Sequence, residues 1–140
     1  ICNHCPYVKA VVAKIVRDMT ELRPHGVGGI AIMSNDPAAQ AEDSFDNMKA
    51  FAMQHGFSFP YVLDETQAVA RAYGAVCTPD FFGFDSDLRL AYRGRLDASG
   101  RSVDPAAARE LFDAMLSVAR TGAGPGVQQP SIGCSIKWKQ

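Results

Sequence analysis

The chain opens with the stretch Ile1-Cys2-Asn3-His4-Cys5-Pro6-Tyr7-Val8-Lys9, which holds two cysteines separated by two residues. A run of apolar residues with helical spacing follows directly, so the two thiols stand at the start of a predicted helix. Unpaired N–H groups and the positive end of the helix dipole favour a thiolate at such a place. The stretch therefore predicts a redox-active dithiol, with Cys2 at the helix tip and Cys5 one turn inside.

The order of the two thiols predicts their roles. We expect Cys2 to have a lowered pKa and to act as the nucleophile, and Cys5 to resolve the mixed disulfide that Cys2 forms. His4 could be cationic or donate a hydrogen bond toward the Cys2 sulfur, and either would stabilise the reduced form. We therefore expect a reduction potential above about −270 mV, toward the oxidising end of the range of protein dithiols.

The length and composition of the chain suit one soluble domain. With 140 residues, of which 47% are hydrophobic, it can bury one core. We expect a single domain over 1–140, with a core over 1–121 and a tail over 122–140 that packs on it. A net charge of −1 with interleaved signs indicates no nucleic-acid surface, and no apolar run approaches the roughly 20 residues of a membrane helix. Four cysteines are too few for a disulfide-stapled scaffold.

Apolar periodicity and turn residues predict an alternating order of helices and strands. The short apolar run 27–33 reads as a buried, parallel strand, and Asp64 offers an N-cap with Gln67 as its capping-box partner. The expected elements are helices over 6–25, 45–52, 64–72 and from 104 onward, strands over 27–33 and 59–63, and a hairpin over 78–92 with a polar turn at 85–87. This order predicts an α/β fold in which helices cover both faces of one mixed sheet.

Thr78-Pro79 stands directly before the hairpin strand, and its spacing from the dithiol resembles that of the thioredoxin superfamily. More narrowly, the chain resembles bacterial peroxiredoxin-like proteins labelled AhpC/TSA family or thiol-disulfide isomerase, through the opening stretch, Ser34-Asn35-Asp36, Asp64-Glu65-Thr66-Gln67 and Pro130-Ser131-Ile132-Gly133-Cys134-Ser135-Ile136-Lys137-Trp138-Lys139. The resemblance covers nearly the whole chain and implies a thioredoxin-like three-layer α/β/α sandwich. Relatives usually carry a first strand before this point, so we expect residues ahead of Ile1.

The resemblance also implies roles around the dithiol. Pro79 would be a cis proline that lies against the thiols and exposes backbone for an extended substrate. Thr78, Tyr7 and Phe81 would line the substrate groove. Cys77, next to Thr78, and Cys134, in the tail, are either packing cysteines or accessory redox thiols. A disulfide between them is possible, but sequence cannot assign the pairing.

These features predict a thiol–disulfide oxidoreductase without a cofactor, acting on protein or small-molecule disulfides, with a thioredoxin-type reductant as one possible partner. A thiol peroxidase is an alternative, although peroxiredoxins carry an arginine where this chain has Pro79, and only Lys9 or Arg71 could replace its charge. A non-catalytic metal-binding or interaction module is another, with His4 and the four cysteines as ligands, but no second close cysteine pair supports it. We expect a cytoplasmic protein, unless a signal peptide precedes Ile1.

Overall fold

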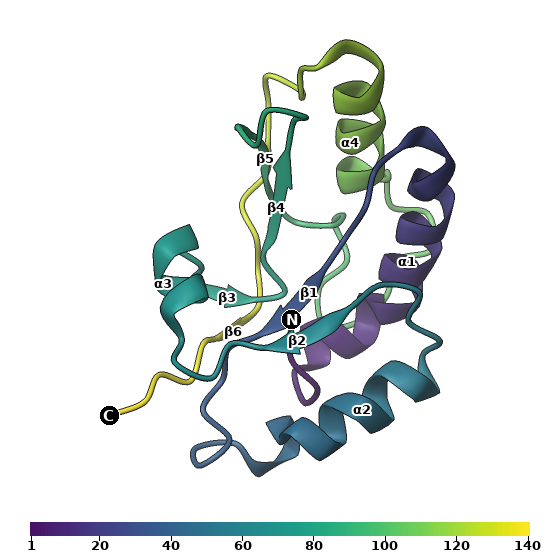
Figure 1. Cartoon of the computed structure of the whole chain (residues 1–140). Helices are drawn as coiled ribbons and strands as arrows, with labels where there is room; N and C mark the ends of the chain where they lie inside the picture. Colours follow the sequence, from purple (N-terminus) through teal and green to yellow (C-terminus); the bar gives the residue numbers. More distant parts are fainter.

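The computed structural model describes all 140 residues, and Figure 1 shows their arrangement. The elements in chain order are α1 (Pro6–Leu22), η1 (Arg23–His25), β1 (Ala31–Met33), η2 (Ala41–Asp43), α2 (Phe45–Gln54), β2 (Tyr61–Leu63), α3 (Ala68–Tyr73), β3 (Cys77–Thr78), β4 (Phe81–Phe84), β5 (Leu90–Gly94), α4 (Glu110–Thr121) and β6 (Cys134–Ser135). The α/β class and the predicted order of elements are confirmed.

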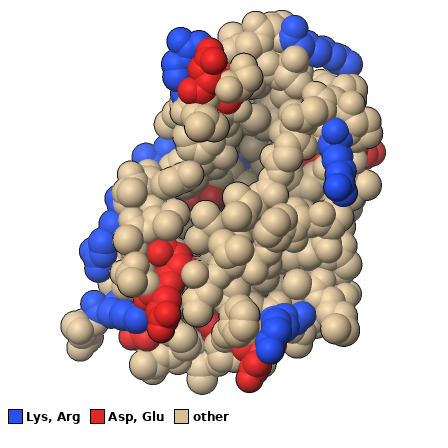
Figure 2. Space-filling view, in the orientation of Figure 1, with Lys and Arg blue, Asp and Glu red and all other residues tan.

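The strands pair two by two, not as the one mixed sheet that the sequence predicted. β1 and β2 are parallel with Ala31 opposite Tyr61, whereas β4–β5 and β3–β6 are antiparallel. Between β1 and β4, which are not hydrogen-bonded to each other, residues of both strands line a cavity of about 890 Å³. Figure 2 shows the middle of this face hollowed, with most of the Lys, Arg, Asp and Glu side chains along its margins.

Helices nevertheless cover both faces of the strand layer. Successive residues of a strand point to opposite faces, and β4 contacts a helix on each of its two faces. A Cβ at Gly83 would overlap Met115 of α4, while the rings of Phe82 and Phe84 meet the edge of Tyr73 on α3. The strand lies between the two helices (Figure 1), as a three-layer fold requires.

Three predicted boundaries are corrected by the structure. The strand predicted at 27–33 begins only at Ala31, and of its three residues only Met33 is buried. Ile30, just ahead of it, lines the open cavity and is 60% exposed. The last helix begins at Glu110, since the residues after Asp104 form a turn first.

The start of α3 is the third correction. The helix begins at Ala68, and its N-cap position is Gln67, which has a left-handed backbone. The Asp64 carboxylate still accepts the free N–H groups of Val69 and Ala70, at 3.2 and 2.9 Å. Asp64 therefore caps the helix from four residues ahead of Ala68. The side chain of Gln67 does not cap the helix and bonds to the C-terminal tail instead.

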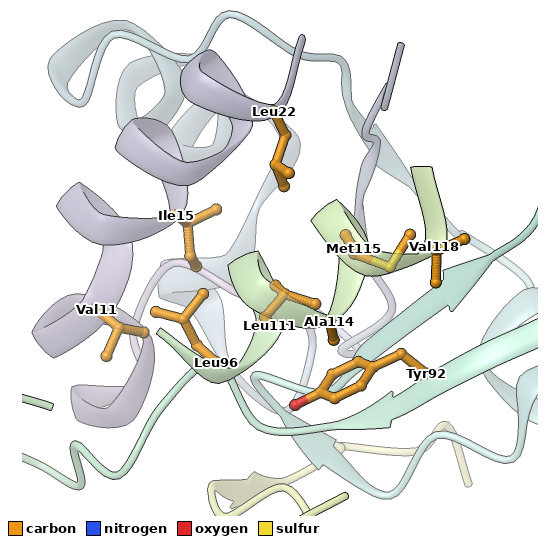
Figure 3. Close-up of a cluster of buried hydrophobic side chains, with 9 residues drawn as sticks. All are labelled: Val11, Ile15, Leu22, Tyr92, Leu96, Leu111, Ala114, Met115 and Val118. Atoms are coloured by element: carbon orange, nitrogen blue, oxygen red, sulfur yellow. The ribbon is translucent and has the colours of Figure 1, made fainter. Parts of the chain in front are cut away.

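Helix α1 separates two hydrophobic cores. The first, called the α1–α4 core, is shown in Figure 3 and comprises Val11, Ile15, Leu22, Tyr92, Leu96, Leu111, Ala114, Met115 and Val118. The second, called the thiol core, comprises Cys2, Cys5, Val8, Val12, Met33, Met48 and Phe51. The dithiol is thus part of a packed interior. No helix has the length and apolar character needed to cross a membrane.

Candidate dithiol site

Cys5, and not Cys2, occupies the tip of α1. The helix begins at Pro6, whose ring suits the first helical position because the missing N–H would have no partner there. Cys5 is therefore the N-cap residue, and Cys2 lies ahead of the bend formed by Asn3 and His4. The predicted placement, with Cys2 at the tip and Cys5 one turn inside, is wrong by one turn. Both thiols are fully buried.

Thr78 lies against both sulfurs. Its Oγ1 is 3.3 Å from the Sγ of Cys2, and its carbonyl oxygen is 3.2 Å from the Sγ of Cys5. The peptide bond between Thr78 and Pro79 is cis, as predicted. The structure therefore brings the Thr-Pro dipeptide onto the dithiol across more than half the length of the chain.

The pKa values of the two thiols are shifted in opposite directions. A hydrogen bond from Cys2, helped by the Cys134 thiol and the N–H groups of Val8 and Cys134, lowers the pKa of Cys5 to about 4. The same pairing with Cys5, together with burial and the nearby Asp43 carboxylate, raises the pKa of Cys2. These shifts favour the thiolate on Cys5, at the positive helix end, whereas the sequence predicted the lowered pKa for Cys2.

Asp43 holds the loop that carries the dithiol. Its Oδ1 accepts the N–H groups of Asn3 and His4, at 2.8 and 3.2 Å. Its Oδ2 lies 2.6 Å from Nδ1 of His4 and accepts the amide of Asn35 at 2.9 Å. Nδ1 of His4 is therefore directed at this buried carboxylate, and the hydrogen bond from His4 to the Cys2 sulfur, one of the two alternatives predicted, is not formed.

The same arrangement bears on metal binding. Donor atoms of Cys2, His4 and Asp43 lie within 4.8 Å of one another, the kind of grouping that could hold zinc. A carboxylate offers about four lone-pair sites, and those of Asp43 are occupied by the four contacts named above. The cluster is thus already satisfied as a hydrogen-bonded clamp.

The accessory cysteines differ from each other. Cys77 is buried, its Sγ lies 3.7 Å from the Pro79 carbonyl oxygen, and burial raises the pKa of its thiol to about 11. Cys134 is half-buried in β6, and its Sγ lies 2.8 Å from the Sγ of Cys5. All four cysteines are free. The structure thus places the tail thiol at the site and gives Cys77 a packing position beside it.

The residues predicted for a substrate groove separate. Tyr7 and Pro79 line one small hollow together with Ile132. Phe81 instead packs against the α1–α4 core and lines the large cavity. Of the cations considered for the site, Lys9 faces Glu42 at 4.0 Å and Arg71 lies over the ring of Trp138.

Asp43, Asn35 and Gln67 are site residues that sequence reasoning missed. Asn35 links Asp43 to the tail, since its Oδ1 accepts the N–H of Lys137 at 2.9 Å. The buried Gln67 amide donates to the carbonyl oxygen of Lys137 and accepts the N–H of Lys139, both at 2.9 Å. Asn35 and Gln67 stand in two of the motifs quoted above, which was a usable signal. Asp43 lies in a polar stretch with no such signal.

The three layers, and a buried dithiol set against Thr78 and a cis proline, define a thioredoxin-like class of protein. Two solved structures agree with this fold. An uncharacterized conserved protein from Geobacillus kaustophilus is 50% identical, with a TM-score of 0.91 over 99% of this chain and 74% of that one. A hypothetical protein from Sinorhizobium meliloti is 36% identical, with a TM-score of 0.94 over 99% of this chain and 76% of that one.

Residues 1–93 match the model of the AhpC/TSA family. The chain therefore belongs to this family, as the resemblance predicted, and membership supports a thiol-based redox function in general. No curated protein matches the sequence.

Proposed function

We propose that the protein is a thiol–disulfide oxidoreductase that exchanges disulfides through the Cys2–Cys5 pair. The observation that carries this proposal is the arrangement of the pair: two buried thiols lie against Thr78, at 3.3 and 3.2 Å, with Cys5 at the N-cap of α1. Thiolates are the species that attack disulfides. A protein with one stable thiolate beside a second, protonated thiol has both halves of the reaction in place.

The reaction follows from the acidity of the two thiols. The Cys5 thiolate attacks one sulfur of the substrate disulfide, bonds to it, and expels the other sulfur as a thiolate. Cys2 then loses its proton to solvent and attacks the Cys5 sulfur, which releases the second substrate thiolate and leaves a Cys2–Cys5 disulfide. This order is the reverse of the one predicted from the sequence.

A stabilised thiolate also bears on the reduction potential. A disulfide whose reduced form is stabilised is a stronger oxidant, and the low pKa of Cys5 supplies that stabilisation. We therefore still propose a potential above thioredoxin's value of about −270 mV, now because of Cys5 and not because of His4. Equilibration of the pair with glutathione buffers measures it, and a value at or below that of thioredoxin would contradict the proposal.

Single substitutions test the exchange reaction. Reduction of a protein disulfide such as that of insulin, with a dithiol as electron donor, should be lost in Cys5→Ser and strongly reduced in Cys2→Ser. Cys77→Ala is the matched control, because Cys77 is also buried but its sulfur faces the Pro79 carbonyl oxygen. Full turnover by Cys5→Ser would sink the assignment of the attacking thiol, and full turnover by both variants would sink the function.

The AhpC/TSA membership favours one second candidate, a thiol peroxidase. The Cys5 thiolate would attack a peroxide oxygen, becoming a sulfenic acid as the alcohol leaves, and a neighbouring thiol would condense with it and release water. The two cations that could replace the family's arginine, Lys9 and Arg71, face Glu42 and the ring of Trp138 instead. We rank this activity second, and the rate of peroxide consumption by the reduced protein tests it.

A further inference from the structure

The C-terminal tail lies where an extended substrate would bind. β6 pairs antiparallel with β3, so that Cys134 stands opposite Thr78, the residue before Pro79. An extended segment that adds to a strand edge is a common way for proteins to hold peptides. Figure 1 shows the tail running past β5 and β4 to reach β3. The chain thus presents one of its own cysteines to the dithiol in the manner of a bound peptide.

Contacts on both sides fix the tail at this place. Before Cys134, the Ser131 hydroxyl lies 2.8 Å from the Asp80 carboxylate and 2.6 Å from the Gly94 carbonyl oxygen. After Cys134, the backbone of Lys137 bonds to Asn35, Asp36 and Gln67. Anchored at both ends, Cys134 has little freedom to leave the Cys5 sulfur, 2.8 Å away.

Gly133 lets the tail approach this closely. A Cβ at this position would lie 2.0 Å from the Thr78 carbonyl oxygen, a distance that no side chain can occupy. At Gly126, in the same tail, a Cβ would meet nothing. Gly133 is therefore a position where one methyl group displaces the tail without altering any thiol.

We propose that Cys134 is a third exchange thiol, which attacks the Cys5 sulfur of the Cys2–Cys5 disulfide. The Cys5–Cys134 bond forms as the Cys2–Cys5 bond breaks, Cys2 leaves as a thiolate, and the proton lost by Cys134 is recovered by Cys2. The exchange needs no further oxidant, because the number of disulfides is unchanged. The inference rests on the proposed function, which supplies the first disulfide.

The surroundings of Cys134 favour its attack in the oxidised protein. Burial and the hydrogen bond with Cys5 raise the pKa of Cys134 to about 11 in the reduced state. Once Cys5 is part of a disulfide it is no longer a thiolate. The hydrogen bond with Cys5 then no longer raises the pKa of Cys134. Cys77 does not have this role, because it stands opposite Ser135 and its sulfur faces the Pro79 carbonyl.

A pair of variants tests the proposal. Reduced Cys2→Ser and Cys2→Ser/Cys134→Ser proteins are treated with glutathione disulfide, quenched with an alkylating agent, and mapped by peptide mass spectrometry. Cys5 should first take up glutathione in both proteins. In the single variant Cys134 then displaces the glutathione and a Cys5–Cys134 disulfide accumulates, whereas in the double variant the glutathione adduct persists.

The outcomes separate this inference from the proposed function. A glutathione adduct that persists equally in both variants overturns the role of Cys134 and leaves the proposed function, which is judged by turnover, intact. An absence of any Cys5 adduct in both variants overturns the role of Cys134 and the assignment of Cys5 as the attacking thiol.

A second measurement leaves all thiols in place. Oxidised wild-type protein should contain both Cys2–Cys5 and Cys5–Cys134 linkages. Gly133→Ala should lower the share of the Cys5–Cys134 linkage by about tenfold, equivalent to about 1.4 kcal/mol, because the added methyl group displaces the tail. Gly126→Ala should match wild type. A Gly133→Ala protein with the wild-type share of this linkage overturns the proposal.

Discussion

The α1–α4 core and the thiol core lie on two sides of one helix and are built differently. The first holds aliphatic and aromatic side chains and one tyrosine hydroxyl, which donates to the Arg95 carbonyl oxygen (Figure 3). The second includes two thiols and is bordered by a fully buried carboxylate, Asp43, and by Asn35. The comparison indicates that α1 packs against an apolar core through one face and against the core that holds the two thiols through the other. Substitutions on the two sides should therefore have separable effects.

The largest expected effect is on the titration of the thiol core. Between about pH 5 and pH 8 the reduced protein should carry one thiolate, where a cysteine of ordinary pKa is protonated, because the pKa of Cys5 is lowered to about 4. Acidification through that pKa should remove the thiolate, as ultraviolet absorbance would record. Cys5→Ser should abolish this signal. Cys77→Ala should retain it, because the Cys77 thiol has a pKa of about 11 and is protonated in this pH range. A signal lost in Cys2→Ser but kept in Cys5→Ser would restore the order predicted from the sequence.

Next in size is a cavity in the α1–α4 core. Leu111 is 4% exposed in that core, and Leu111→Ala should lower the free energy of unfolding by about 2–5 kcal/mol. The thiolate titration should stay in place, because no sulfur of the pair belongs to this core. Denaturant unfolding measures the change in stability, and ultraviolet absorbance measures the thiolate titration. Leu90→Ala, at a 54% exposed site on β5, should change stability by less than about 0.5 kcal/mol. A shifted pKa of Cys5 in Leu111→Ala would show that the two cores are coupled.

A smaller effect is expected at the polar border of the thiol core. Asp43→Asn should lower the pKa of Cys2, because the carboxylate that disfavours its thiolate is removed. It should also cost about 1–3 kcal/mol of stability, because buried donors lose their acceptor. The pH dependence of Cys2 alkylation and denaturant unfolding measure the two effects. Glu42→Gln is the control, since the neighbouring Glu42 side chain is exposed and faces only Lys9. An unchanged or raised Cys2 pKa in Asp43→Asn would contradict this account.

The smallest effect concerns α2, which supplies Met48 and Phe51 to the thiol core. The Ser44 hydroxyl accepts the N–H of Asn47 at 3.2 Å and caps the helix. Ser44→Ala should therefore lower stability by about 1 kcal/mol without moving the Cys5 titration. Ser86→Ala, in the exposed turn between β4 and β5, should be neutral in the same unfolding assay. Equal stability of the two variants would show that the cap contributes nothing.

Local signals were enough to predict most elements and the pair of thiols. The apolar stripe of α1, the polar turn of the β4–β5 hairpin and the Thr78-Pro79 dipeptide act over a few residues, so their consequences can be read from neighbouring positions. Even the N-cap position of Cys5 had a local signal, because a proline favours the first helical position. The prediction of residues ahead of Ile1 stays a prediction.

The order of acidity, the direction of His4 and the place of Cys134 depended on contacts between distant parts of the chain. Asp43 is 40 residues from Asn3, Thr78 is 76 from Cys2, and Cys134 is 129 from Cys5. A thiol pKa responds to charges, hydrogen-bond donors and burial within a few ångströms, and residue spacing does not reveal which distant groups meet there. Sequence alone could therefore predict a dithiol at the start of α1, whereas folding decided which groups surround each sulfur and which third thiol lies beside them.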